Sequence, residues 1–240
     1  MNRDLYIPSV TKEIVSKYGF KFSKSLGQNF LVDGNIIRNI CEGANITKED
    51  AIIEIGPGIG TLTQQLCKYA NKVIAIELDK SLLPILDETL SKYDNVKVIN
   101  EDVLKVDLEK LIEDEFKGLN VKVVANLPYY ITTPIIMKIL EERLNIQKIV
   151  VMIQKEVAER MKSNPGSKDY GALSIAVQYY SKPEIIATVP SSVFIPRPNV
   201  DSAVIHLLIR NEPPVSIKDE AMFFRVVRAS FGQRRKRSEE

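Results

Sequence analysis

Residues 126–130 place an amide side chain, a proline and two aromatic rings directly after the apolar run 121–125, which predicts a buried strand. The side-chain carbonyl of Asn126 and the backbone carbonyl of Leu127 can both accept hydrogen bonds from an exocyclic amine. The proline stiffens the turn, and either tyrosine can stack on a flat ring. This Asn-Leu-Pro-Tyr-Tyr motif therefore indicates a pocket for an aromatic ring that carries an amino group. A simple turn with two half-buried tyrosines is the alternative.

A second motif, Glu-Ile-Gly-Pro-Gly-Ile-Gly-Thr at 54–61, lies between a strand-like run, 51–53, and a helix-like run, 62–69. Glycines in such a turn let the backbone approach a ligand closely, and the helix N-terminus offers free N–H groups. The spacing differs from the Gly-x-Gly-x-x-Gly of dinucleotide sites. The turn has no lysine to neutralise phosphate, and Glu54 would repel a diphosphate. It suits a cationic ligand end, such as the amino group and sulfonium of S-adenosylmethionine, although the glycines also fit a nicotinamide dehydrogenase.

Polar residues also follow the next strands of the predicted sheet. Glu77 comes after the strand 72–76, about 20 residues beyond the glycines, where an acidic side chain takes two ribose hydroxyls. Asp102 follows the strand 96–99 and can accept from an adenine amine. The carboxyl ends of parallel strands are the edge at which open α/β sheets bind ligands. These residues together predict an adenosyl ligand.

Taken in order, the motifs resemble the ribosomal RNA adenine N6-dimethyltransferase family over nearly the whole chain. The resemblance is carried by Gly-Gln-Asn-Phe-Leu at 27–31, the glycine turn, Glu77, Asp102, the Asn-Leu-Pro-Tyr-Tyr motif, Phe-Ile-Pro-Arg-Pro-Asn-Val-Asp-Ser at 194–202 and Phe-Gly-Gln-Arg-Arg-Lys at 231–236. The branch that dimethylates two adjacent adenosines near the 3′ end of 16S rRNA fits best, on Tyr-Gly-Ala-Leu-Ser at 170–174 and the basic tail. A 23S rRNA enzyme of macrolide resistance, and a ribosome-assembly factor whose methylation is secondary, remain alternatives.

The resemblance implies a role for each matching residue, with S-adenosylmethionine as the cofactor. The cofactor-binding residues are Gln28, Asn29, Leu31, Glu54, Gly56, Gly58, Glu77, Asp102 and Asn126. The catalytic residues are Asn126, Leu127, Tyr129 and Phe194, with the two rings flanking the target base. The RNA-binding residues are Lys21, Lys24, Arg197, Arg234, Arg235 and Lys236. The implied partner is 16S rRNA within the small ribosomal subunit.

Composition limits the other possibilities. The net charge of the 240 residues is only +2, but basic residues gather near both ends, where they can contact phosphates on one face. Cys41 and Cys67 have no metal-ligand spacing and His206 is the only histidine, so we expect neither a metal site nor a Ser-His-Asp site. The unpaired cysteines, and the lack of a signal peptide or a membrane-length apolar run, predict a cytoplasmic protein. We expect a monomer.

The alternation of strands and helices predicts an α/β fold, a doubly wound Rossmann-like methyltransferase sheet with a small C-terminal helical appendage. We expect a catalytic domain over 1–210, which includes a basic N-terminal arm at 1–30. Residues 211–240 are expected to hold a linker and the first helix of a C-terminal helical domain that continues in family members. A capping box of Ser216 and Asp219 predicts this helix over 218–230, with some apolar surface exposed. Thr133-Pro134 predicts the start of an earlier helix, over 135–143.

Overall fold

A computed structural model of the protein describes residues 3–23 and 25–232. The strands are β1 (Phe30–Leu31), β2 (Asp50–Ile55), β3 (Lys72–Glu77), β4 (Val96–Asn100), β5 (Asn120–Asn126), β6 (Lys148–Gln154), β7 (Ser181–Val189), β8 (Phe194–Ile195) and β9 (Ser202–Ile209). The helices are α1 (Pro8–Lys17), α2 (Gly34–Ala44), α3 (Thr61–Tyr69), α4 (Leu83–Leu90), α5 (Leu108–Glu115), α6 (Thr132–Glu141), α7 (Lys155–Lys162), α8 (Ala172–Tyr180) and α9 (Glu220–Gly232), with short 3₁₀ turns η1 (Lys80–Leu82) and η2 (Ser191–Val193).

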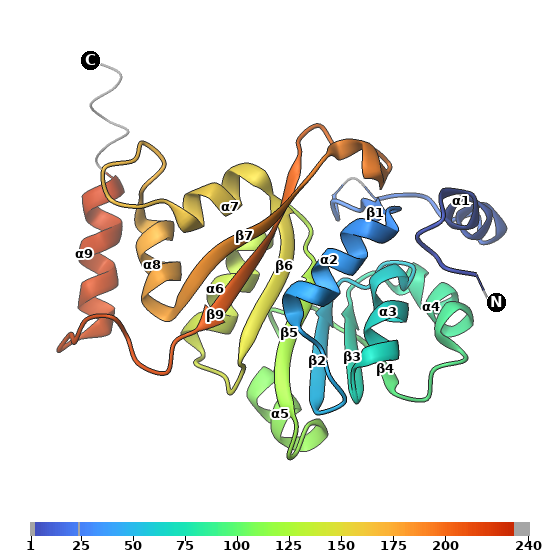
Figure 1. The fold of residues 1–240 in the computed structure, drawn as a ribbon, viewed down its shortest axis with the longest axis horizontal. Helices are drawn as coiled ribbons and strands as arrows, with labels where there is room; N and C mark the ends of the chain where they lie inside the picture. The colour runs from blue at the N-terminus through green and yellow to red at the C-terminus, as the bar shows by residue number, and fades with distance from the viewer. Residues whose placement is uncertain (1–2, 24, 233–240) are drawn as a thin grey trace.

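Seven strands form the central sheet, in the order β4-β3-β2-β5-β6-β9-β7 (Figure 1). The strands from β4 to β6 are parallel, whereas β9 runs antiparallel to both β6 and β7. The strand order reverses between β2 and β5, and ligands bind at such a switch point in open α/β sheets. The predicted doubly wound Rossmann-like sheet is thus confirmed.

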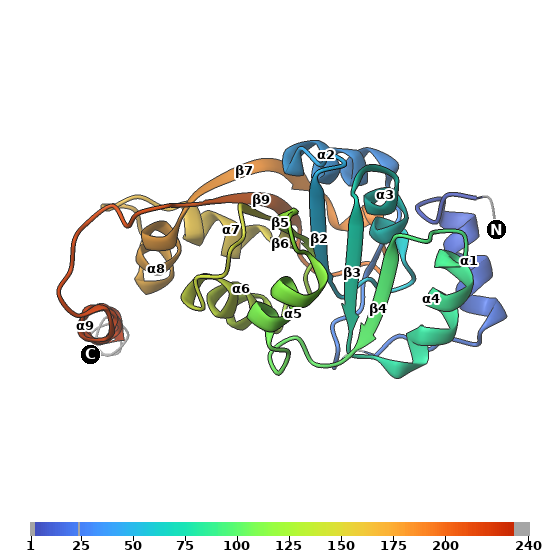
Figure 2. The ribbon, with the colours of Figure 1, turned by 90° about the horizontal axis from the view of Figure 1, so that it is seen from below.

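The sheet is buried on both faces because alternate residues of its parallel strands enter different apolar clusters. On β2, Ile53 and Ile55 pack with helices α5 to α8, while Ile52 packs with α2 and α3. Figure 2 shows these two layers on opposite sides of the sheet. A third cluster joins α1 and α4 at the β4 edge, and Phe30 lies in it.

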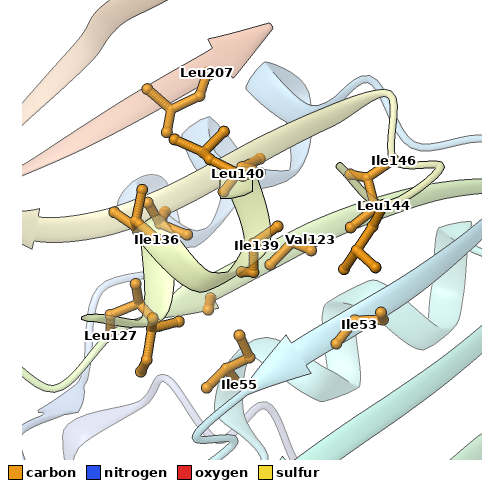
Figure 3. Close-up of a cluster of buried hydrophobic side chains, with 14 of the residues drawn as sticks. Ile53, Ile55, Val123, Leu127, Ile136, Ile139, Leu140, Leu144, Ile146 and Leu207 are labelled. Carbon is orange, nitrogen blue, oxygen red and sulfur yellow. The ribbon is translucent and has the colours of Figure 1, made fainter. Parts of the chain in front are cut away.

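The turn after β5 is fixed to the core through one side chain. Leu127 is buried among Ile55, Ile136 and Ile139, as Figure 3 shows. Its backbone N–H donates to the Met152 carbonyl of β6, at 3.0 Å. The Leu127 side chain therefore points into the core, and the Asn-Leu-Pro-Tyr-Tyr turn cannot shift without opening a cavity there.

Two predicted helix starts are wrong by a few residues. Helix α6 begins at Thr132 without a side-chain cap, so Thr133-Pro134 lies inside its first turn rather than before it. A proline is tolerated there because the first N–H groups of a helix have no acceptor within the helix. Helix α9 begins at Glu220, and Asp219 caps it alone by accepting from the N–H of Met222, at 2.9 Å.

Helix α9 lies at the end of the molecule remote from α1 and packs on α8 (Figures 1 and 2). The contact is aromatic, because the Phe224 ring stacks on that of Tyr180 and meets that of Tyr179 edge-on. On the opposite side Met222 and Val226 are about half exposed, at 48% and 56%. One apolar face of α9 is therefore buried, and another remains exposed as expected.

Candidate active site

A pocket opens at the carboxyl ends of β2 to β5. Its walls are the arm segment 26–31, the glycine turn, the ends of β3 and β4, and the turn after β5. The structure thus brings together eleven residues that the sequence singled out, which are Gln28, Asn29, Leu31, Glu54, Gly56, Gly58, Glu77, Asp102, Asn126, Leu127 and Tyr129.

The glycine turn requires glycine for two reasons. Gly56 and Gly58 have φ angles of +69° and +59°, in the left-handed region that other residues rarely adopt. In addition, a Cβ on Gly58 would lie 3.0 Å from the Phe30 ring. The turn is therefore closely covered by the arm, while its backbone still faces the pocket.

Glu54 lies in the pocket wall as a buried carboxyl group. Its side chain is 1% exposed, and its Oε2 atom has no hydrogen-bond partner among the described residues. Burial raises the pKa of Glu54 to about 8, because the charged form loses its hydration. A buried acceptor without a partner is costly, so this atom is suited to receive a donor from a ligand.

Glu77 is held in position by two backbone donors. Its Oε1 accepts from the N–H of Asp79 at 2.7 Å, and its Oε2 accepts from the N–H of Gly58 at 3.3 Å. Burial raises the pKa of Glu77 to about 7, although these hydrogen bonds favour the ionised form. The carboxylate joins the end of β3 to the glycine turn, and Glu77 lines the pocket.

Asp102 is half-buried at the end of β4. Its Oδ1 accepts from the N–H of Leu104 at 3.0 Å, which fixes the carboxylate, and no donor among the described residues reaches its Oδ2. The neighbouring Asn100 donates to the Glu77 carbonyl at 2.7 Å and so ties the ends of β3 and β4 together. The two acidic residues therefore lie on adjacent strands.

The orientation of the Asn126 carboxamide follows from a single contact. Its Nδ2 donates to the backbone carbonyl of Asn29, at 3.2 Å. Only the nitrogen of a carboxamide can donate to a carbonyl oxygen, so Nδ2 must face the arm and Oδ1 must face elsewhere. No described donor reaches Oδ1 or the Leu127 carbonyl. The turn thus offers two unused acceptors.

The two rings expected to flank the base lie in different environments. Tyr129 lines the pocket, and its hydroxyl hydrogen bonds with the Oγ of Ser202 at 2.6 Å. Phe194 is not on the pocket wall. It is 3% exposed and packs in the cluster of α2 and α3, while its backbone pairs with Leu31. Stacking by Phe194 would require the β8 segment to move, and it stays a prediction.

The predicted RNA-binding residues are only partly described. Lys21 and Arg197 are exposed, and Arg197 donates from Nε to the Oγ of Ser191 at 3.0 Å. Lys24, Arg234, Arg235 and Lys236 lie outside the described residues. No group of three or more His, Cys, Asp or Glu residues that could hold a metal ion occurs within 3–23 and 25–232.

Sequence reasoning missed two residues that support the pocket. Ser202 holds the hydroxyl of Tyr129, and Asp79 holds the side chain of Gln28 at 2.6 Å. Both lie within or next to segments that the sequence had singled out. Polar residues at the ends of strands were the only available signal, because their partners are distant in the chain.

Comparisons with known proteins identify the family. The model of the ribosomal RNA adenine dimethylase family matches residues 19–239. The chain belongs to the ribosomal RNA adenine dimethylase family.

One member from Alkaliphilus oremlandii, a ribosomal RNA small subunit methyltransferase A, is 63% identical over 95% of this chain and 80% of its own length. A solved dimethyladenosine transferase from Plasmodium falciparum is 31% identical, with a TM-score of 0.73 over 85% of this chain and 71% of that one. The 23S rRNA methyltransferase ErmE is 29% identical, with a TM-score of 0.71 over 85% of this chain and 79% of that one. As a dimethylase of this family the chain is a methyltransferase, and S-adenosylmethionine is its methyl donor.

Proposed function

We propose that this dimethylase converts two adjacent adenosines near the 3′ end of 16S rRNA to N6,N6-dimethyladenosine during maturation of the small ribosomal subunit. The observation that carries the proposal is the Asn126 carboxamide, which is held by its nitrogen so that its oxygen is free beside the Leu127 carbonyl. The 63% identity to a small subunit methyltransferase, against 29% to ErmE, favours 16S over 23S rRNA.

The residues of the pocket fit the cofactor. Glu54 offers a buried acceptor without a partner to the cationic methionine end, and Gly56 and Gly58 leave room for close approach. Glu77 is fixed to receive ribose hydroxyls, and Asp102 to accept from the adenine amine. Asn29 and Leu31 close the pocket from the arm. When bound, S-adenosylmethionine supplies a methyl group that its sulfonium has already activated.

The protein's task in catalysis is to make a poor nucleophile reactive. The lone pair of an adenine amine is shared with the ring. If Asn126 Oδ1 and the Leu127 carbonyl each accept one amine hydrogen, the nitrogen is drawn toward sp³ geometry and its lone pair is localised. This lone pair would then face the methyl group that a bound S-adenosylmethionine would supply, and the amine proton would pass to solvent after the transfer. Alignment supplies most of the rate, and no strong base is needed before transfer.

Stacking on aromatic rings holds the target base during methyl transfer. Tyr129, whose hydroxyl is fixed by Ser202, presents its ring as one wall for an adenine that has been flipped out of the RNA. Phe194 is the proposed second wall once RNA is bound. After the first transfer one N–H remains, so the site must accept a methyl group where a hydrogen was.

The proposal also covers the location of the enzyme, its oligomeric state and its contacts with RNA. We infer that the enzyme acts in the cytoplasm as a monomer on 16S rRNA within the small subunit, with no metal. Lys21, Lys24, Arg197, Arg234, Arg235 and Lys236 are the proposed phosphate contacts. Within the described residues no helix has both the length and the apolarity to cross a membrane.

Methyl transfer to separated rRNAs tests the proposal. Small and large subunits from cells without these methylations are incubated with the enzyme and labelled S-adenosylmethionine, and the rRNAs are then resolved. We expect label in 16S rRNA as dimethyladenosine at two adjacent positions. Label in 23S rRNA alone would assign the chain to the macrolide-resistance branch, and subunit binding without any label would favour an assembly role.

A further inference from the structure

The side chain of Gln28 uses both of its polar atoms within the protein. Its Nε2 donates to the Oδ2 of Asp79 at 2.6 Å, and its Oε1 accepts from the N–H of Ser23 at 2.7 Å. The first bond crosses from the arm to Asp79, two residues after the end of β3, and the second is a contact within the arm. Although Gln28 lines the pocket, its amide therefore acts as a latch rather than as a free ligand group.

Gly27, the residue before Gln28, lies directly over the Asn-Leu-Pro-Tyr-Tyr turn at 126–130. A Cβ on Gly27 would lie 3.4 Å from the Tyr130 ring and 3.8 Å from the backbone nitrogen of Tyr129. The Asn29 side chain donates to the Gly27 carbonyl at 2.9 Å, which fixes the loop locally. Asn29, the residue after Gln28, supplies the backbone carbonyl that accepts from the Asn126 amide nitrogen at 3.2 Å. The arm residue that contacts Asp79 and the arm residue that contacts Asn126 are thus neighbours in the chain.

Asp79, the acceptor for Gln28, also contacts Glu77, the carboxylate proposed to bind the ribose. Asp79 donates its N–H to Glu77 at 2.7 Å, so the residue that Gln28 grips also fixes the proposed ribose carboxylate. Oδ1 of Asp79 accepts from the N–H of Ser81 at 2.9 Å, which leaves Oδ2 for Gln28. The Ser81 hydroxyl also donates to Oδ1, at 2.6 Å, so the two carboxylate oxygens of Asp79 serve different partners.

We propose that Gln28 is a positioning residue that latches the arm to Asp79 and, through the Asn29 carbonyl, keeps the Asn126 Oδ1 turned toward the target amine. The inference rests on the proposed function of Asn126 and adds how its orientation is set. Without the latch the arm remains attached through the pairing of β1 with β8 and through Phe30, but the Asn29 carbonyl loses its fixed place. The acceptor carboxamide can then rotate, and turnover falls.

A reversal of the hydrogen bond tests the latch. Gln28→Glu keeps the size of the side chain and the acceptor for Ser23, but it sets a carboxylate against that of Asp79. Asp79→Asn alone removes the charge that strengthens the bond. In the double variant Gln28→Glu/Asp79→Asn, the introduced amide donates to the introduced carboxylate, while its oxygen still accepts from Ser81. The matched control is Gln147→Glu, since Gln147 donates to Asn120 at 2.8 Å on the opposite edge of the sheet.

The readouts are kcat on small subunits at saturating cofactor, the KM for S-adenosylmethionine and thermal stability. We expect Gln28→Glu to lower kcat by roughly ten- to a hundredfold, as for loss of a hydrogen bond to a charged group. The double variant should recover most of that loss, and Gln147→Glu should match the wild type. If the double variant is no more active than Gln28→Glu, the latch is refuted. A change confined to the KM would refute it as well, because Gln28 would then act on the cofactor alone. Failure of the proposed function would instead be seen in the wild type, as absence of 16S methylation.

Discussion

The amino and carboxyl edges of the central sheet, where its parallel strands begin and end, carry buried acidic side chains in contrasting environments. At the amino edge, Asp50 of β2 and Lys122 of β5 form an ion pair at 2.7 Å, with side chains 2% and 5% exposed. Lys122 also donates to the Asn45 carbonyl, and Asp50 accepts from the N–H and hydroxyl of Thr47. At the carboxyl edge, Glu54 lies on the same face of β2, four residues on, with an oxygen that has no partner among the described residues.

The difference separates a structural site from a binding site. A buried charge whose partners are all present adds rigidity and needs nothing further. A buried carboxyl without a partner remains protonated, and it is stable as a carboxylate only when a ligand brings a donor or a cation. Substitutions at the amino edge should therefore lower stability, and those at the carboxyl edge should lower function.

The largest effect is expected from Lys122→Ala, which leaves the Asp50 carboxylate buried without its cation. Loss of one partner of such a pair costs about 3–5 kcal/mol of the free energy of unfolding. Urea unfolding followed by circular dichroism measures it. The control, Asp50→Asn/Lys122→Met, removes both charges and should be less destabilised than the single variant. An equal loss in both would mean that packing, not charge pairing, explains the effect.

Asn126→Ala should lower activity rather than stability. Removal of an acceptor aimed at the reacting group should lower turnover about a hundredfold or more, as for other preorganised catalytic contacts. Affinity for S-adenosylhomocysteine, measured by calorimetry, should stay near that of the wild type. A variant that loses cofactor affinity but methylates small subunits normally at saturating cofactor would contradict the role given to Asn126.

Glu54→Gln should raise stability in a pH-dependent way and weaken cofactor binding about tenfold. The pKa of Glu54 is about 8 in the folded protein, against 4.5 in the unfolded chain. The folded state therefore holds this proton longer, and its contribution to stability is complete below pH 4.5 and is lost as the pH rises to about 8. The gain of the variant over the wild type should grow across this range.

Unfolding free energies of both proteins at pH 5 and pH 8.5 decide this prediction. Glu77, with a pKa of about 7, titrates over part of the same range in both proteins, so the difference between them isolates Glu54. A stability difference that does not change with pH would show that Glu54 is already ionised at pH 5.

Asp102→Ala should have a smaller effect, again confined to the carboxyl edge. One acceptor for an adenine amine is removed, which costs about 0.5–1.5 kcal/mol of binding free energy, or a two- to tenfold weaker affinity. Titration with S-adenosylhomocysteine measures it, and Asp114→Ala on the exposed face of α5 is the control. Unchanged affinity would place the adenine elsewhere.

The smallest effect is expected where a charge pair is exposed. Arg143 pairs with Glu220 at the start of α9, with side chains 54% and 34% exposed. Arg143→Ala should lower the free energy of unfolding by only about 0–1 kcal/mol, because solvent screens the pair.

Hydrogen exchange should be faster over 215–232 than in β5, both in the wild type and in Arg143→Ala. Protection in α9 equal to that in β5 would contradict the division of the chain near residue 210.

The sequence by itself determined the sheet and the residues at its carboxyl edge. Alternating runs fix which strand follows which helix. The order of glycine turn, Glu77, Asp102 and Asn126 places one backbone turn and three polar side chains at one edge of any parallel sheet. This works because side-chain periodicity and strand direction are local properties. The ends of α6 and α9 were placed less well, since caps depend on contacts of a few atoms.

Only the tertiary structure decided what these groups contact. It showed that Asp50 is satisfied by Lys122, 72 residues away, while Glu54 is left with a free oxygen. It also placed Phe194 in the core and gave Gln28 a partner in Asp79, 51 residues on. Burial and hydrogen-bond pairing depend on which distant segments pack together, and no spacing along the chain encodes that. The sequence thus supplies the chemical groups, and packing decides which of them stay free to act.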